Sequence, residues 1–135
     1  MSSVVDASVA LKWVVHEEGS EAADRLLDEP DDLLAPDFLL IEAANVLWKR
    51  TVRSEMRPAE ADQAFDLLRA GVLVFLPTTP LLESARRLAR RLRHPVYDCL
   101  YIALAERERA PLLTADSRLA RRLGSRSPVP VRVLS

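Results

Sequence analysis

Residues 3–15 read SVVDASVALKWVV and contain the two features on which the fold depends. The first three residues predict a short buried strand, and apolar residues at helical spacing over residues 8–15 predict a helix directly after it. Asp6 lies at the junction and is the only charged side chain between Ser2 and Leu11. The stretch therefore predicts a strand–helix unit with a carboxylate at the carboxyl end of the strand.

The alternation of strand and helix continues along the chain. Further short apolar runs predict strands at residues 33–35, 72–76, 112–114 and 131–133. Helical spacing predicts helices at 21–28, 38–52 with Asp37 as its cap, 58–69, 80–91, 96–108 and 117–123. This pattern favours an α/β fold in which helices flank a central, mainly parallel sheet of about five short strands.

Length and composition narrow the class of protein. The chain has 135 residues, 49% of them hydrophobic and 29% charged, which is typical of one globular domain spanning residues 1–135. No apolar run approaches the roughly 18 residues of a membrane-spanning helix, so no membrane association is expected. The N-terminus lacks the pattern of a secretory signal, and a cytoplasmic location is expected. Cys99 is the only cysteine, which excludes an intrachain disulfide and a thiolate metal cluster.

Charge is distributed unevenly along the chain. Residues 1–80 carry 7 basic and 15 acidic side chains, whereas residues 81–135 carry 12 basic and 5 acidic ones. A basic half is typical of proteins that bind a polyanion such as nucleic acid. The genome's composition can also favour arginine, and helices commonly carry solvated arginines without any binding function. Nucleic-acid binding and a solvated surface therefore both stay open as explanations of the basic half.

Four acidic residues stand out because their surroundings are apolar: Asp6, Glu42, Asp98 and Asp116. Each of the first three is the only charged side chain in its apolar run, and the fourth closely follows the predicted strand at 112–114. Functional residues collect beyond the carboxyl ends of parallel strands. Converging carboxylates repel one another unless a cation holds them ionised, and an all-oxygen set suits Mg²⁺ or Mn²⁺. The pattern predicts a metal site.

Each acid also has a purely structural interpretation. Asp6 and Asp116 precede helices and fit the N-cap position. Asp98 falls in a first helical turn, where the helix dipole favours an anion. Glu42 has the weakest structural explanation, because it lies in the second turn of an apolar helix. The structural and functional interpretations both stay open at this point.

Polar neighbours of the acids are candidates for supporting them. The hydroxyls of Ser8 and Thr114 each lie two residues from an acid and either bond to the carboxylates or satisfy nearby backbone groups. Asn45 lies three residues after Glu42 and either orients a ligand or occupies an exposed helix edge. Lys49, further along the same stripe, fits a solvated helix end.

Other candidate residues give no sign of a different chemistry. His16 and His94 have no partner at a recognised zinc spacing and are expected at the surface. The chain has no Gly-x-Ser-x-Gly elbow and no glycine-rich phosphate loop, which disfavours a serine hydrolase and the common nucleotide-binding folds. Four aromatic residues beside apolar neighbours are expected in the core rather than on a base-stacking surface: Trp13, Trp48, Tyr97 and Tyr101.

The four acids lie in four motifs. These read VVDASVALKW at 4–13, EAANVLW at 42–48, YDCLYIALAE at 97–106 and LLTAD at 112–116. In this order and spacing the chain resembles PIN-domain ribonucleases of the VapC toxin type over nearly its whole length. Cys99 departs slightly from the pattern, since a small residue such as alanine is usual there. The resemblance implies a three-layer PIN-like fold.

The resemblance also implies an activity. It points to a Mg²⁺- or Mn²⁺-dependent endoribonuclease with one or two ions, the toxin component of a toxin–antitoxin system, which cuts RNA phosphodiester bonds. Asp6, Asp98 and Asp116 are then expected as direct or water-mediated metal ligands, and Glu42 as the residue that positions the ion or the attacking water. A homodimer, and an antitoxin that inserts a basic side chain into the acidic pocket, are implied as well.

An acidic pocket repels RNA unless basic surface flanks it. The candidates for RNA binding lie on the two predicted helices at 80–91 and 117–123 or beside them: Arg86, Arg90, Arg93, Arg118, Arg121 and Arg122. Two alternatives stay open. One is a non-catalytic protein of the same fold that binds a partner, and the other is a DNA-directed nuclease of the same fold.

Overall fold

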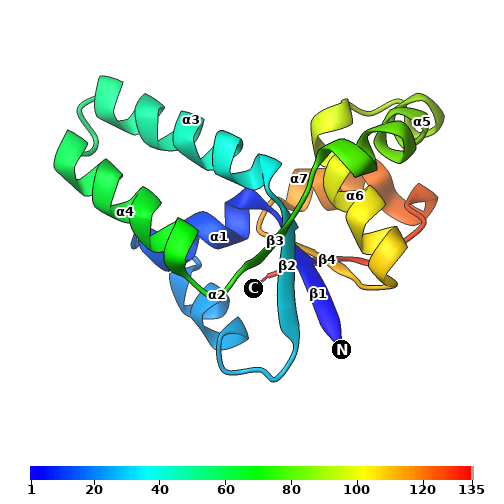
Figure 1. The fold of residues 1–135 in the computed structure, drawn as a ribbon, viewed down its shortest axis with the longest axis horizontal. Helices are drawn as coiled ribbons and strands as arrows, with labels where there is room; N and C mark the ends of the chain where they lie inside the picture. Colours follow the sequence, from blue (N-terminus) through cyan, green and yellow to red (C-terminus); the bar gives the residue numbers. More distant parts are fainter. Residues whose placement is uncertain (135) are drawn as a thin grey trace.

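In a computed structural model, which describes residues 1–134, five parallel strands form one central sheet (Figure 1). The strands are β1 (Ser2–Val5), β2 (Asp32–Pro36), β3 (Val74–Leu76), β4 (Leu112–Thr114) and β5 (Val131–Val133). Their order in the sheet is β3-β2-β1-β4-β5, and every pairing is parallel. The predicted α/β fold with five short parallel strands is confirmed.

Helices cover both faces of this sheet (Figure 1). They are α1 (Ala7–Val14), α2 (Ser20–Leu26), α3 (Phe38–Val52), α4 (Pro58–Ala70), α5 (Leu82–Leu92), α6 (Val96–Glu108) and α7 (Ser117–Leu123), with 3-10 turns at Thr79–Leu81 and Gly124–Arg126. Parallel strands are joined by right-handed crossovers almost without exception. The chain moves outward from β1 to β3 and then returns past β1 to β4 and β5. Helices α1–α4 therefore lie on one side, and α5–α7 on the other.

The direction of the chain reverses between β1 and β4, which are neighbours in the sheet. Val5 pairs with Leu113, and the backbone N–H of Asp6 donates to the Leu113 carbonyl at 3.2 Å. At such a switch point the connections leave toward opposite faces and open a crevice beyond the strand ends. The residues that follow β1 and β4, including Asp6 and Asp116, are placed at this crevice by the topology alone.

Helix α6 is the central element of its side of the sheet. Residues 99–105 are all buried, because the sheet packs on one side of the helix and α5 on the other. A helix enclosed on all sides has no polar face. This explains why its sequence is apolar without interruption from Cys99 to Ala105. None of the helices within residues 1–134 is both long and apolar enough to cross a membrane.

The start of α3 differs from the prediction. Asp37 does not cap the helix with its side chain. Its Oδ1 instead accepts hydrogen bonds from the backbone N–H of Thr78 at 3.1 Å and from the Thr78 hydroxyl at 2.5 Å. The Thr78 hydroxyl oxygen in turn accepts from the backbone N–H of Phe38 at 2.8 Å. The helix is therefore capped by a residue that lies beyond β3 in the sequence.

Several predicted element boundaries also shift by one or two residues, and the helix expected over 21–28 is α2, which ends at Leu26. Strand β3 begins at Val74 rather than at residue 72, and the helix expected over 80–91 opens with the 3-10 turn at Thr79–Leu81 before α5 starts at Leu82. Differences of one or two residues are common at the ends of helices and strands, which fray.

The prediction that four aromatic residues lie in the core is half right. Tyr101 is buried and Trp13 is partly buried, but Trp48 and Tyr97 are 58% and 62% exposed. The Tyr97 ring stacks on that of Phe38 at 5.8 Å between centroids. Apolar neighbours in the sequence do not determine which side of a helix faces the sheet, and these two side chains stay largely exposed.

Truncation of a core side chain on α6 should destabilise the fold. Ile102 is fully buried, so Ile102→Ala is expected to lower the free energy of unfolding by about 2–5 kcal/mol through lost contacts and a residual cavity. Ile41 on α3 is 65% exposed, and Ile41→Ala should change it by less than about 0.5 kcal/mol. Denaturant titration measures both, and equal effects would contradict the packing of α6 described above.

Candidate functional site

A cavity of about 380 Å³ lies at the carboxyl ends of β1 and β4. All four predicted acids line it: Asp6 before α1, Glu42 on α3, Asp98 on α6 and Asp116 before α7. Residues from four separate elements thus meet in one hollow. A larger hollow of about 530 Å³ lies between α3 and α4, but none of the four acids lines it.

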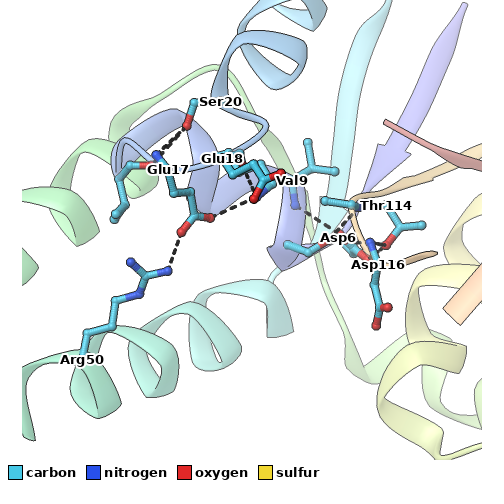
Figure 2. A network of polar contacts seen from close by, with 12 residues as sticks. Asp6, Val9, Glu17, Glu18, Ser20, Arg50, Thr114 and Asp116 are labelled. Carbon is cyan, nitrogen blue, oxygen red and sulfur yellow. Dashed lines mark hydrogen bonds and ion pairs between the residues drawn. The ribbon is translucent and has the colours of Figure 1, made fainter. Parts of the chain in front are cut away.

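Asp6 is buried and all of its hydrogen bonds come from neutral donors. Its Oδ1 accepts from the Ser8 hydroxyl at 2.5 Å and from the backbone N–H of Val9 at 3.3 Å, and its Oδ2 accepts from the Thr114 hydroxyl at 2.6 Å (Figure 2). Burial raises the pKa of Asp6, hydrogen bonds from Ser8 and Thr114 oppose the rise, and the charge of Asp98 adds to it. Asp6 is therefore both an N-cap and a cavity acid.

Thr114 joins two of the acids. Besides donating to Asp6, its hydroxyl oxygen accepts from the backbone N–H of Asp116 at 3.0 Å. The two interpretations left open for Thr114 both hold, since it bonds to one carboxylate and satisfies a nearby backbone group, but the Asp116 carboxylate itself accepts from the backbone N–H groups of Arg118 and Leu119, at 2.9 and 3.3 Å. Asp116 thus caps α7, and its side chain is more exposed than that of Asp6.

Glu42 is only partly exposed, and its Oε1 accepts a short hydrogen bond from the hydroxyl of Tyr101 on α6. Burial raises the pKa of Glu42, the bond from Tyr101 lowers it, and the charges of Asp98 and Asp6 raise it further. Burial and the neighbouring Glu42 charge raise the pKa of Tyr101 as well, so its hydroxyl stays a donor. Sequence reasoning assigned Tyr101 only to the core.

Asp98 has a partner that the sequence analysis placed at the surface. His94 is buried, not exposed, and its Nε2 lies 2.6 Å from Asp98 Oδ2. The two residues are four apart, a spacing that brings side chains together at the start of a helix. This spacing was the available signal.

Asn45 and Lys49, the other polar residues predicted near Glu42, line the cavity without forming a hydrogen bond or ion pair with the acids. Asn45 lines the cavity with its side chain exposed. Lys49 is the one basic residue among the cavity's lining residues and forms no ion pair with any residue in the range 1–134. The four acids likewise have no Lys or Arg partner within this range. Apart from the unpaired Lys49 at its wall, the described part of the chain therefore places no Lys or Arg against the acids of the cavity.

The donor chemistry of the cavity fits a hard divalent cation. Its acids offer only carboxylate oxygens, and Glu42, Asp98 and Asp116 each have one oxygen that accepts no hydrogen bond from residues 1–134. As the side chains stand, no three His, Cys, Asp or Glu residues in this range converge closely enough to enclose an ion. The arrangement suits an open site, in which water completes the coordination, better than a closed cage.

The predicted RNA-binding arginines lie outside the cavity. All six are exposed, on α5, on α7 or at the end of α5: Arg86, Arg90, Arg93, Arg118, Arg121 and Arg122. We call this set the α5–α7 arginine surface. Arg126 connects its two parts, because its guanidinium donates to the Leu92 carbonyl at the end of α5, at 3.1 Å, and to the Arg122 carbonyl at the end of α7.

An ion-pair cluster at the far end of α1 fixes the position of α3. Glu17 accepts from Lys12 Nζ at 3.2 Å and from Arg50 Nη2 at 2.5 Å (Figure 2). Burial raises the pKa of Glu17, but the bonds from Arg50 and Lys12 outweigh it, and the pKa is lowered overall. The cluster therefore ties the segment that follows α1 to α3.

Comparison with known proteins places the chain in a family. The PIN domain family model matches residues 3–123. Ribonuclease VapC3 of Pyrobaculum aerophilum is 36% identical over 124 residues, which cover 89% of this chain and 93% of that protein.

Two solved structures share the fold. The crystal structure of PAE2754 from Pyrobaculum aerophilum has a TM-score of 0.72 at 24% identity and covers 90% of this chain and 84% of that chain. A toxin–antitoxin complex from Klebsiella pneumoniae has a TM-score of 0.65 at 13% identity, with 91% of each chain covered. Since the family model and the named relative both extend along most of the sequence, the chain belongs to the PIN-domain family.

Proposed function

We propose that the protein is a divalent-metal-dependent endoribonuclease of the VapC type, the toxin component of a toxin–antitoxin pair. The observation that carries the proposal is a cavity lined by four carboxylates that have no Lys or Arg partner within residues 1–134. The relative named Ribonuclease VapC3 supports RNA as the substrate, and the structural neighbour titled as a toxin–antitoxin complex supports an antitoxin as the partner.

Asp6, Glu42, Asp98 and Asp116 would hold one or two ions of Mg²⁺ or Mn²⁺. When bound, such an ion supplies charge neutralisation of the phosphodiester and activation of the attacking water. Asp6 is held in place by Ser8 and Thr114, so it contributes a fixed negative charge at the floor of the site. The more exposed Asp98 and Asp116 leave the entrance open to substrate.

The chain's own residues account for the other requirements of hydrolysis. Glu42 keeps one oxygen bonded to Tyr101 and one oxygen available to orient water. Attack of water at phosphorus with departure of the 3′-oxygen leaves 5′-phosphate and 3′-hydroxyl ends. An antitoxin that inserts an Arg or Lys side chain into the cavity would supply the missing positive charge and block the site.

RNA cleavage should depend on Asp98 and on a divalent ion. We expect purified protein with total bacterial RNA and Mg²⁺ or Mn²⁺ to produce discrete new 5′-phosphate ends. Asp98→Asn should reduce their rate of formation by at least about 100-fold, the upper end of what loss of a group supporting a metal site produces. EDTA should abolish them. Sequencing of the 5′-phosphate ends measures the outcome and identifies the cleaved RNA.

Asp62→Asn is the matched control, because Asp62 lines the separate hollow between α3 and α4. It should cleave as wild type does. Identical end maps from wild type and Asp98→Asn would reject catalysis by this cavity and favour the partner-binding alternative. Metal-dependent cleavage of DNA without cleavage of RNA would favour the DNA-directed nuclease.

The α5–α7 arginine surface should contribute to RNA binding but not to metal binding. Replacing Arg90 and Arg93 with alanine removes two positive charges, so RNA affinity should fall and the salt dependence of log K should flatten by about 0.7 for each lost phosphate contact. Mn²⁺ affinity should not change. Filter binding over a range of salt concentrations, with calorimetry for Mn²⁺, gives both values.

Arg53→Ala combined with Arg57→Ala removes the same charge from the turn between α3 and α4 and is the control for net charge. If this control weakens RNA binding as much as the Arg90 and Arg93 replacement, the effect is not local. Loss of Mn²⁺ affinity in the Arg90 and Arg93 variant would also contradict the assignment.

The acid cavity should make the protein less stable as pH rises. The pKa values of Asp6 and Glu42 are raised in the folded state, so between the ordinary and the raised values the folded state holds more protons than the unfolded state. Stability therefore falls as pH rises through that window and stays lower above it. Glu42→Gln keeps the acceptor for Tyr101 and removes the charge.

We expect Glu42→Gln to raise the melting temperature by a few degrees at neutral pH and to have little effect below pH 4.5, the ordinary pKa of a glutamate. Mg²⁺ should raise the melting temperature of wild type at neutral pH by binding the folded state. Thermal unfolding followed by circular dichroism measures both. A Glu42→Gln effect of equal size at both pH values would show that its charge is not responsible.

A further inference from the structure

His94 is a buried imidazole that contacts one of the cavity acids and has no role in the function proposed above. Its side chain is 7% exposed, and its Nε2 lies 2.6 Å from Asp98 Oδ2. An ionised carboxylate can only accept hydrogen bonds, so the imidazole N–H is the donor. The Asp98 side chain itself is 38% exposed, and no other residue in the range 1–134 donates to it.

The backbone on both sides of His94 is tied down. Arg93, which ends α5, has a φ of 53°, and its N–H and that of His94 both donate to the Ala89 carbonyl, at 3.1 Å for His94. The carbonyl of His94 faces the Cys99 thiol at 3.9 Å, and Pro95 follows as the residue before α6. The imidazole therefore projects from a fixed turn between the two helices.

The hydrogen bond from His94 restricts the orientation of the Asp98 carboxylate. One carboxylate oxygen is occupied by His94, and the other accepts no hydrogen bond from residues 1–134. Without this bond a partly exposed aspartate is free to rotate toward solvent. The charge of Asp98 is also among the causes that raise the pKa values of Asp6, Glu42 and Tyr101, so Asp98 lies close enough to interact with all three.

We infer that His94 is a positioning residue that holds the Asp98 carboxylate in the orientation in which it binds the divalent ion. Carboxylate ligands are commonly held by hydrogen bonds from neighbouring side chains, and loss of such a bond weakens metal affinity. The inference rests on the proposed metal site and extends it to a residue outside the four acids.

Mn²⁺ binding to the intact protein, measured by calorimetry in the absence of RNA, tests the inference. His94→Leu removes the donor, and His94→Asn has an amide too short to reach Asp98. Both should weaken Mn²⁺ affinity by about 10- to 100-fold. The amide nitrogen of His94→Gln reaches nearly as far as the imidazole Nε2 and should restore most of the affinity. His16→Leu, at an exposed histidine outside the cavity, should bind as wild type does.

Melting temperatures of the same variants separate positioning from packing. If His94 only fills space between α5 and α6, the variants lose stability without the predicted order of Mn²⁺ affinities, and the inference is overturned. If His94→Leu does not fold, the Asn and Gln variants decide, and equal affinities overturn it. If His94→Leu keeps the wild-type Mn²⁺ affinity while Asp98→Asn loses it, the proposed role of His94 is overturned and the proposed metal site is not. No Mn²⁺ binding by wild type overturns the metal site and this inference together.

Discussion

The burial of negative charge at one end of the sheet, together with repulsion among Asp6, Glu42 and Asp98, is the constraint to which the rest of the site is fitted. Burial and the charge of Asp98 raise the pKa of both Asp6 and Glu42, so the cluster is unfavourable when fully ionised. Within residues 1–134 the carboxylates are held by hydroxyl, backbone N–H and imidazole donors, the hydroxyls of Thr114 and Tyr101 among them, rather than by Lys or Arg. Such donors fix the carboxylates without cancelling their charge, and the attraction for a cation from solution is preserved.

The order of the strands brings the acids together in a chain of only 135 residues. The chain leaves β1 and β4 toward opposite faces, so Asp6 and Asp116 lie at the same edge while their helices diverge. Both aspartates accept hydrogen bonds from backbone N–H groups of the helix that follows. The structural and functional interpretations of these residues are therefore compatible, because a helix N-terminus stabilises the same negative charge that the cavity presents.

The sequence predicted most elements because the strands are short apolar runs and most helices have apolar residues at helical spacing, as at β4 and α5. The acids could be found because they interrupt such runs. Contacts between distant segments could not. Thr78 caps α3 from beyond β3, and the exposure of Trp48 depends on which side of α3 meets the sheet. His94 was missed for another reason: it lies four residues before Asp98 but outside α6, so the spacing is only a weak signal, and the distance between the two side chains is what reveals the contact.

Paired and unpaired charges are distributed unevenly along α5. Near the start of the helix, Glu83 pairs with Arg86 at 2.9 Å and with Arg87 at 3.3 Å, which reduces the net charge there. Near its end, Arg90 and Arg93 have no acidic partner within residues 1–134. Unpaired positive charge is therefore concentrated next to His94, at the end of α5 that leads into α6 and Asp98. A polyanion attracted to this end arrives beside the cavity, where a bound cation, rather than an arginine, would offset the repulsion of the acids.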